Sequence, residues 1–238
     1  MPAVALATQL REGTKKSHTM AENTGFVSCF LKGVVDKSTY RKLIADLYFV
    51  YFTMEEELSR LIKEHHPVVS LIDFEELNRC QSLEEDLSFY FGENWSNLLP
   101  VSSSAKAYKD RIKHIAVTQP ELLIGHHYTR YIGDLSGGQI LKRIAKKAMN
   151  ISGDNGLKFY EFAQIKDPKE FKLKYSKTLN SLPIDQKMAD SIVDEANLAF
   201  KYNMDMFKEL EGNLIAVIGK LLFSFLTRKS RMGSTESS

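Results

Sequence analysis

The chain has 238 residues, 43% of them hydrophobic and 26% charged, so it can bury a sizeable core and is expected to form one globular domain. Its 32 basic residues nearly balance 30 acidic ones, for a net charge of +2, and this balance gives no support to a nucleic-acid partner. Two cysteines, Cys29 and Cys80, are too few for a disulfide framework and lack the spacing of a structural zinc site.

Apolar residues recur at intervals of three and four along most of the chain, as in Leu43, Leu47, Val50 and Met54. This is the period of amphipathic helices, and the two-residue alternation of strands is nearly absent. The sequence therefore predicts an all-α, single-domain helical bundle. We expect the domain to span 1–226 and the polar segment 227–238 to be a disordered tail.

Capping and breaking residues divide the pattern into helices. Gly25 is expected to end the first helix, and a capping box of Ser82 and Glu85 to begin another that closes at Gly92. The remaining signals predict a long helix from Asp36 or Ser38 to about His65, a helix starting at Pro120, a loop at 151–156, a helix starting at Asp167 and Pro168, and a final helix over 184–225.

The ends of the chain show no membrane-spanning signal. The first residues lack the apolar core of a secretory peptide, which indicates a soluble protein without a transmembrane anchor. The apolar stretch 214–226 is shorter than the roughly 20 residues that a spanning helix needs. It is read as the packed end of the last helix, with peripheral membrane contact through the basic residues that follow as the alternative.

The segment PELLIGHHYTRYIGDLSGGQILK is helical in its flanks but contains Gly133, Gly137 and Gly138. Three glycines inside a helix cost about 3 kcal/mol relative to alanine, so some other interaction has to offset them. They favour close approach of a flat ligand and a kink of the helix. Tight helix packing, or a loop between two helices, explains them equally well. Asp134 between them could hold water at such a surface or simply be solvated.

His18 lies in the first predicted helix, with Arg11 and Lys15 seven and three residues before it. These spacings place the two cations on the side of the imidazole. A neutral imidazole can bind heme iron, and neighbouring cations can pair with the heme propionates. From spacing alone, however, a surface or capping histidine is the simpler interpretation.

The other histidines and metal motifs offer weaker alternatives. His126 and His127 precede Gly133 closely enough to reach the same cavity, although roles in the core or in a polar network fit them better. A di-iron carboxylate bundle would use two Glu-x-x-His pairs, and no histidine of this chain has a glutamate three residues before it. Heme-attachment and nucleotide-binding motifs are absent from the sequence.

Five segments in order resemble the heme oxygenases, closely those of cyanobacteria and algal plastids: LREGTKKSHTMAEN, LYFVYFTMEEE, FEELNRCQSLEEDL, PELLIGHHYTRYIGDLSGGQILK and ANLAFKYNMDMFKELE. The resemblance extends from the N-terminus to about Phe225. It implies heme held between a first, proximal helix and a Gly-rich, kinked distal helix.

The resemblance also implies roles for individual residues. His18 would be the proximal ligand of the heme iron, with Glu22 orienting its ring. Asp134 would hold the distal water network, with Gly133 and Gly137 against the heme. The other implied members of the distal network are Tyr51, Tyr108, Arg130 and Asn203. The other implied heme-binding residues are Arg11, Lys15, Tyr128, Gly138, Lys172, Lys177, Phe200 and Phe207.

One position departs from the family pattern. In many members an arginine follows the tyrosine of the propionate-binding helix, whereas here Ser176 follows Tyr175. Lysine does not replace a planar guanidinium, so the hypothesis is that Lys172 and Lys177 preserve the usual seating of the heme. A product mixture containing biliverdin isomers other than α would contradict this hypothesis.

The implied activity is cleavage of heme b by O2 at the α-meso carbon to biliverdin IXα, carbon monoxide and ferrous iron. Electrons would come from reduced ferredoxin, whose acidic surface suits a basic N-terminal face, and a bilin reductase could use the product. The resemblance implies a cyanobacterial cytoplasm or a plastid stroma. The alternatives are a non-catalytic heme-binding protein for storage, sensing or delivery, and an enzyme acting on another small heterocycle.

Overall fold

The computed structural model describes residues 5–97 and 99–232, with side chains as far as Glu211. The regular elements of this part of the chain are helices, which confirms the predicted all-α bundle. The main helices are α1 (Leu6–Gly13), α2 (Lys15–Glu22), α3 (Gly25–Leu31), α4 (Lys37–Lys63), α5 (Cys80–Phe91), α6 (Ser103–Thr118), α7 (Leu123–His127), α8 (Gly133–Ala148), α9 (Pro168–Asn180) and α10 (Gln186–Met232).

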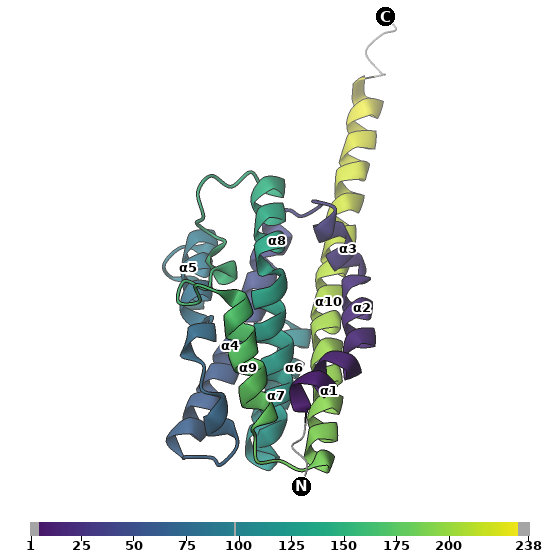
Figure 1. Ribbon diagram of the computed structural model, residues 1–238. Coiled ribbons are helices and arrows are strands. Elements are labelled where there is room, and N and C mark those ends of the chain that lie inside the picture. The colour runs from purple at the N-terminus through teal and green to yellow at the C-terminus, as the bar shows by residue number, and fades with distance from the viewer. Residues whose placement is uncertain (1–4, 98, 233–238) are drawn as a thin grey trace, which may run out of the picture.

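The two longest helices organise the bundle (Figure 1). Helix α4 packs against α5 and α6, while α10 packs against α6, α7 and the three N-terminal helices. Helix α8 stands in the middle of the view, and α1, α2 and α3 lie along α10 at one edge. Buried apolar side chains form one continuous cluster that extends from Leu6 to Leu210.

The predicted starts of α4 and α9 are confirmed, and each has a carboxylate cap. The side chain of Asp36 accepts a hydrogen bond from the Thr39 amide at 3.0 Å at the start of α4. At the start of α9, Asp167 accepts from the amides of Lys169 and Glu170 at 2.8 and 3.1 Å. These caps satisfy amides that have no partner in the first helical turn.

Two predicted boundaries are wrong. The predicted first helix is two short helices, α1 and α2, and Gly25 begins α3 instead of ending that helix. Helix α5 begins at Cys80, so Ser82 lies inside it and forms no capping box. Its cap comes from α4, because the carboxylate of Glu55 accepts hydrogen bonds from the amides of Arg79 and Cys80 at 2.6 and 3.3 Å.

The structure describes only part of the predicted C-terminal segments. The backbone of α10 continues to Met232, so the predicted tail, 227–238, begins within this helix. Residues 233–238, and the side chains of the apolar stretch 214–226, lie outside the described residues. Over the described ranges, no helix combines the length and apolar character needed to cross a bilayer.

Helix α7 approaches α10 so closely that their backbones touch at Gly125. A β carbon added there would lie 2.8 Å from the Ala196 nitrogen and 2.8 Å from the Ile192 oxygen, both of them backbone atoms of α10. Backbone atoms inside a packed helix cannot move aside as a flexible side chain can. This contact requires glycine and fixes the position of the chain just before the segment that carries Asp134.

We expect Gly125→Ala to lower the free energy of unfolding by about 1–3 kcal/mol, because it overpacks the contact between α7 and α10. The matched control is Gly137→Ala in α8, where a β carbon would meet no atom within 4 Å. That variant should gain up to about 1 kcal/mol from helix propensity. Urea unfolding of the chain without added ligand measures both, and equal effects of the two substitutions would contradict the close contact.

Candidate functional site

A cleft opens between α2, α8 and α10. It consists of two adjoining hollows of about 930 and 1200 Å³, both open to solvent. Six residues line both hollows: His18, Glu22, Thr129, Gly133, Gly137 and Phe200. Ligand sites are typically concave and mostly apolar with a few polar groups, and this cleft has that character.

His18 faces the cleft from α2. Its side chain is 58% exposed, and its Nδ1 lies 3.6 Å from Oε2 of Glu22, one turn further along the same helix. The imidazole meets the ring of Phe200 edge-on, with 5.9 Å between ring centroids. With Nδ1 directed to a carboxylate, Nε2 is the nitrogen available to a metal, an arrangement common among histidine ligands.

The opposite wall is formed by α8 and the turn before it. Tyr128–Ile132 form a single π-helical turn between α7 and α8, and α8 then runs regularly through its glycines. The predicted irregularity therefore lies before the glycines and not at them. Such turns insert a residue into a helix and change the direction in which the next residues face, and they are frequent at functional sites.

The three glycines of α8 have different roles. A β carbon at Gly133 or Gly137 would meet no atom within 4 Å, so both face open space in the cleft. Gly138 faces away from it, because a β carbon there would lie 3.3 Å from the ring of Tyr160. The helix-packing alternative thus applies to Gly138, and the flat-ligand interpretation fits Gly133 and Gly137.

The predicted distal residues meet in a polar network beside the cleft. Arg130 donates through Nη1 to Oδ1 of Asn203 at 2.7 Å and through Nη2 to Oδ2 of Asp134 at 3.2 Å. Its Nε donates to the Tyr51 hydroxyl at 3.3 Å, and that hydroxyl donates to Asp134. The network thus joins α4, the π-helical turn, α8 and α10.

Burial controls the protonation of this network. It raises the pKa of Asp134 above its ordinary value, and the Arg130 guanidinium opposes the rise. Burial also raises the pKa of Tyr51 well above its usual range, so its hydroxyl keeps its proton and donates. For Tyr108, burial raises the pKa, while the Arg130 charge and a hydrogen bond to Asn203 oppose the rise.

The basic residues expected at one edge of the cleft are only partly assembled. Arg11, Lys15 and Tyr128 line the larger hollow, and Nζ of Lys172 on α9 lies 3.3 Å from the hydroxyl of Ser136 in the same lining. Lys177 is exposed on α9 and lines neither hollow. The structure brings Lys172 to the cleft but not Lys177.

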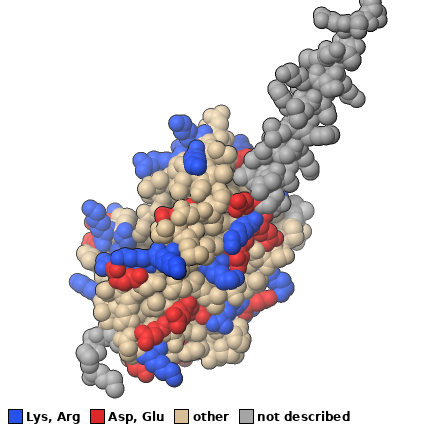
Figure 2. Space-filling model, turned by 90° about the vertical axis from the view of Figure 1, so that its right-hand side faces the viewer, with Lys and Arg blue, Asp and Glu red and all other residues tan. Residues whose placement is uncertain are grey.

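The predicted basic N-terminal face carries charges of both signs. Arg11 and Lys15 each pair with Glu12, at 3.0 Å in the case of the arginine. In Figure 2, which presents the side of the bundle bearing α10 and α2, lysine and arginine side chains alternate with acidic ones. A partner would therefore meet a mixed surface and not a uniformly positive one.

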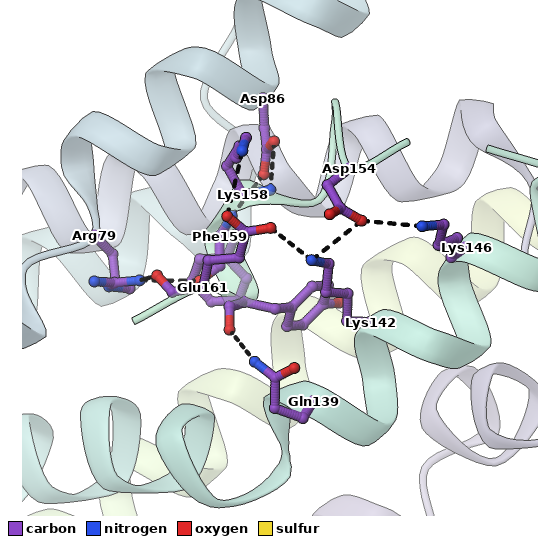
Figure 3. A network of polar contacts seen from close by, with 10 residues as sticks. Arg79, Asp86, Gln139, Lys142, Lys146, Asp154, Lys158, Phe159 and Glu161 are labelled. Carbon is purple, nitrogen blue, oxygen red and sulfur yellow. Dashed lines mark hydrogen bonds and ion pairs between the residues drawn. The ribbon is translucent and has the colours of Figure 1, made fainter. Parts of the chain in front are cut away.

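The segment Lys158–Glu161, called the strap below, packs against the face of α8 that is turned away from the cleft (Figure 3). No pattern in the sequence predicts this contact. Asp86 of α5 accepts hydrogen bonds from the amides of Lys158 and Phe159, both at 2.8 Å. From α8, Gln139 donates to the Tyr160 carbonyl at 2.8 Å, and Lys142 pairs with Glu161 at 2.5 Å.

The strap also borders the polar network from the interior of the bundle. Its Phe159 and Tyr160 line an apolar cavity that also contains Arg130 and Asp134. Burial raises the pKa of Asp86, which holds the strap, to about 7. No sequence motif marks these residues, because Asp86, the carboxylate that holds them, lies 72 residues before Lys158 in the chain.

The remaining histidines near α8 are buried in polar contacts, as expected. His126 lies 2.8 Å from a carboxylate oxygen of Glu195 and 3.2 Å from the Tyr108 hydroxyl. Nδ1 of His127 lies 2.8 Å from the Tyr175 hydroxyl. In the described part of the chain, no group of three or more His, Cys, Asp or Glu side chains could hold a metal ion.

Comparison with known proteins gives consistent matches over nearly the whole chain. The sequence model of the family described as heme oxygenase matches residues 4–209. Heme oxygenase 1 of Synechocystis is 60% identical over 98% of this chain and 96% of its own length. The heme oxygenase of the alga Rhodella violacea is 53% identical over 94% of each chain.

Solved structures agree with these matches. The crystal structure of Synechocystis heme oxygenase-1 in complex with heme has a TM-score of 0.89 at 60% identity, covering 94% of this chain and all of that one. Heme oxygenase from Leptospira interrogans has a TM-score of 0.83 at 43% identity, covering 87% of this chain. With a family model over most of its length and relatives of this identity on the same fold, the chain belongs to the heme oxygenase family.

Proposed function

We propose that this chain binds heme in the cleft between α2 and α8, with His18 as the iron ligand, and opens it to biliverdin IXα with O2. One observation carries the proposal. An exposed histidine on α2 faces a buried carboxylate network on α8 across a cleft, and the two glycines between them lack any neighbour for a side chain. A planar substrate fits against such a bare helix surface.

When bound, heme supplies both the iron that activates O2 and the ring that is oxidised, releasing biliverdin, carbon monoxide and ferrous iron. The residues of the chain bind, orient and supply protons. Glu22, 3.6 Å from Nδ1 of His18, orients the imidazole and leaves Nε2 for the iron. Phe200 packs edge-on against the same ring and limits its rotation.

Asp134 acts on the distal side. Its carboxylate is held by Arg130 and by the Tyr51 hydroxyl, so its position is fixed before substrate arrives. Because burial raises its pKa, Asp134 can exchange a proton with water in the cleft. Asn203 accepts a hydrogen bond from Arg130 at 2.7 Å and so helps to hold the guanidinium, whose charge also acts on the buried Tyr108 phenol.

The larger hollow offers the charges that heme propionates need. Arg11, Lys15 and Tyr128 line it, and Lys172 reaches its rim at Ser136. Charge-assisted hydrogen bonds from these groups would orient the heme edge. Phe200 and Phe207 line the neighbouring hollow and supply apolar contact, whereas Lys177 and Gly138 are left without a role at the substrate.

Reduced ferredoxin is the proposed electron donor, in a cyanobacterial cytoplasm or a plastid stroma. The support is the similarity to cyanobacterial and algal heme oxygenases. A bilin reductase would then be the class of enzyme that consumes the product. Because the α1–α2 surface carries both positive and negative charges, we expect a docking partner with complementary charges of both signs. The attraction between the two surfaces should weaken as the salt concentration rises.

The decisive experiment titrates the purified chain with hemin, then supplies ferredoxin, its reductase and NADPH under air. We expect stoichiometric binding, loss of the Soret band and biliverdin IXα on product chromatography. Ascorbate as the sole reductant is the control for donor specificity. Heme that stays bound and intact under confirmed reduction would favour the storage or sensing alternative, and absence of binding would favour another heterocyclic substrate.

We expect His18→Ala to change the ferric and ferrous carbonyl spectra of the hemin complex, because iron loses its nitrogen ligand. Added imidazole should restore them, while Glu22→Gln should weaken hemin binding by roughly tenfold without changing the ligand. The matched control is His114→Ala, since His114 is exposed on α6 away from the cleft. A His18→Ala complex with the spectra of the parent chain would rule out this ligand.

We expect Asp134→Ala to bind hemin but to make biliverdin about a hundredfold more slowly, the order of magnitude contributed by a placed acid or base. Without its carboxylate, the site should also oxidise a phenol such as guaiacol in peroxidase fashion when hydrogen peroxide is supplied as the oxidant. Biliverdin chromatography and guaiacol oxidation measure the two outcomes. An unchanged biliverdin yield would remove Asp134 from the mechanism.

A further inference from the structure

A buried histidine, His127, joins α7 to α9 outside the cleft. It is 3% exposed, and its Nδ1 lies 2.8 Å from the hydroxyl of Tyr175. The two rings are stacked almost in parallel, with 5.5 Å between centroids and 7° between planes. Hydrogen bond and stacking together define both the distance and the rotation of α9 relative to α7.

Burial keeps both partners of this hydrogen bond uncharged. Burial lowers the pKa of His127 to about 3, so the imidazole is neutral at physiological pH. Burial also raises the pKa of Tyr175 well above its usual range, so the phenol keeps its proton. The contact between Nδ1 of His127 and the Tyr175 hydroxyl is therefore a hydrogen bond between two uncharged partners.

Tyr175 is the polar member of the buried face of α9. The other buried residues of this helix are Phe171 and Leu179. The ring of Phe74 packs on both Tyr175 and Phe171, with centroid distances of 5.1 and 5.6 Å. Apolar packing alone tolerates sliding and rotation, whereas a hydrogen bond to a fixed imidazole selects one register.

His127 is linked to the distal network through the ring of Tyr131. Its ring centroid lies 4.5 Å from that of Tyr131, which lies 5.1 Å from that of Tyr51. Tyr51 in turn donates to Asp134. His127 thus stands between the helix that carries Lys172 and the helix turn that carries the distal network.

Lys172 is three residues before Tyr175 on α9, and its ammonium reaches Ser136 at the cleft. A rotation of α9 would move this ammonium away from the rim. Ser176, next to Tyr175, supplies no cation, so Lys172 is the described cation of α9 that the structure brings to the cleft. Asn180 and Lys174 of α9 also have polar partners, in Ala7 and Glu76, but both lie on the exposed side of the helix, whereas His127 holds its buried side.

We propose that His127 is a positioning residue that fixes the in-plane orientation of bound heme by holding Tyr175, and with it Lys172, at the rim of the cleft. The proposal deepens the function proposed above and rests on it. Heme rotated within its own plane presents a different meso carbon to Asp134. A contact that fixes the propionate edge thereby selects which carbon is oxidised.

The test compares Tyr175→Phe and His127→Phe, which keep a ring at each position and remove the hydrogen bond. Lys172→Ala and the double variant Tyr175→Phe with Lys172→Ala complete a double-mutant cycle, which measures whether the two residues act independently. His114→Phe is the control for the same substitution at an exposed site. One readout is the proton NMR spectrum of the heme methyl groups in the equilibrated ferric cyanide complex, which reports heme orientation without turnover.

The second readout is the isomer composition of biliverdin, and thermal unfolding of each variant is recorded alongside. We expect roughly a tenfold rise in the share of the minor heme orientation and of non-α isomers, a factor within reach of one buried hydrogen bond. The double variant should show the same heme orientation and isomer composition as Lys172→Ala alone, because Tyr175 is proposed to act by placing the Lys172 ammonium. His114→Phe should match the parent chain.

Variants that are less stable but keep the parent NMR spectrum and isomer composition would overturn the proposal and leave His127 a purely structural role. Additive effects in the cycle would overturn the route through Lys172. Altered heme orientation in a chain that makes no biliverdin would support the positioning role while contradicting the proposed function. Failure of the parent chain to bind hemin would contradict both.

Discussion

The buried guanidinium of Arg130 is the constraint on which the site depends. It is 7% exposed, and an unpaired cation at that depth would be strongly destabilising. Its partners come from three different helices: Tyr51 of α4, Asp134 of α8 and Asn203 of α10. Satisfying one charge therefore fixes three helices around the same point, and that point borders the cleft.

The geometry of α8 follows from two further constraints at its ends. Gly125 lets α7 touch the backbone of α10, and the π-helical turn then sets the direction in which Gly133 and Asp134 face. On the far side, the strap at Lys158–Glu161 presses Tyr160 against Gly138. The bare face of α8 is tolerated because its other face is held by packing and by hydrogen bonds from Gln139 and Lys142.

Sequence patterns predicted what depends on neighbours along the chain. Helical periodicity indicated the all-α class, and Asp36 and Asp167 marked true helix starts. The resemblance to a family singled out Arg130, Asp134, Tyr51 and Asn203, which the structure brings together. Spacing alone could have paired Arg130 with Asp134 but not with Tyr51 or Asn203, which are 79 and 73 residues away in the chain.

Sequence patterns did not anticipate features that depend on residues distant in the chain. Ser82 and Glu85 carry a capping pattern, yet α5 is capped by Glu55 from α4, and a local rule cannot anticipate a distant carboxylate. The resemblance also implied Gly138 and Lys177 as heme-binding residues, but Gly138 packs against Tyr160 and Lys177 is exposed and lines neither hollow. Asp86 and the strap left no local pattern at all.

The two walls of the cleft differ in how many buried contacts hold them in place. The α8 wall carries a buried, interlocked network, whereas α2 buries only Ala21 and presents His18 and Glu22 more than half exposed. A wall with so few buried contacts opens at low cost, so the proximal side can admit a large planar molecule. Ligation of iron by His18 would then draw α2 onto its substrate, and the acid on the distal side would stay where Arg130 holds it.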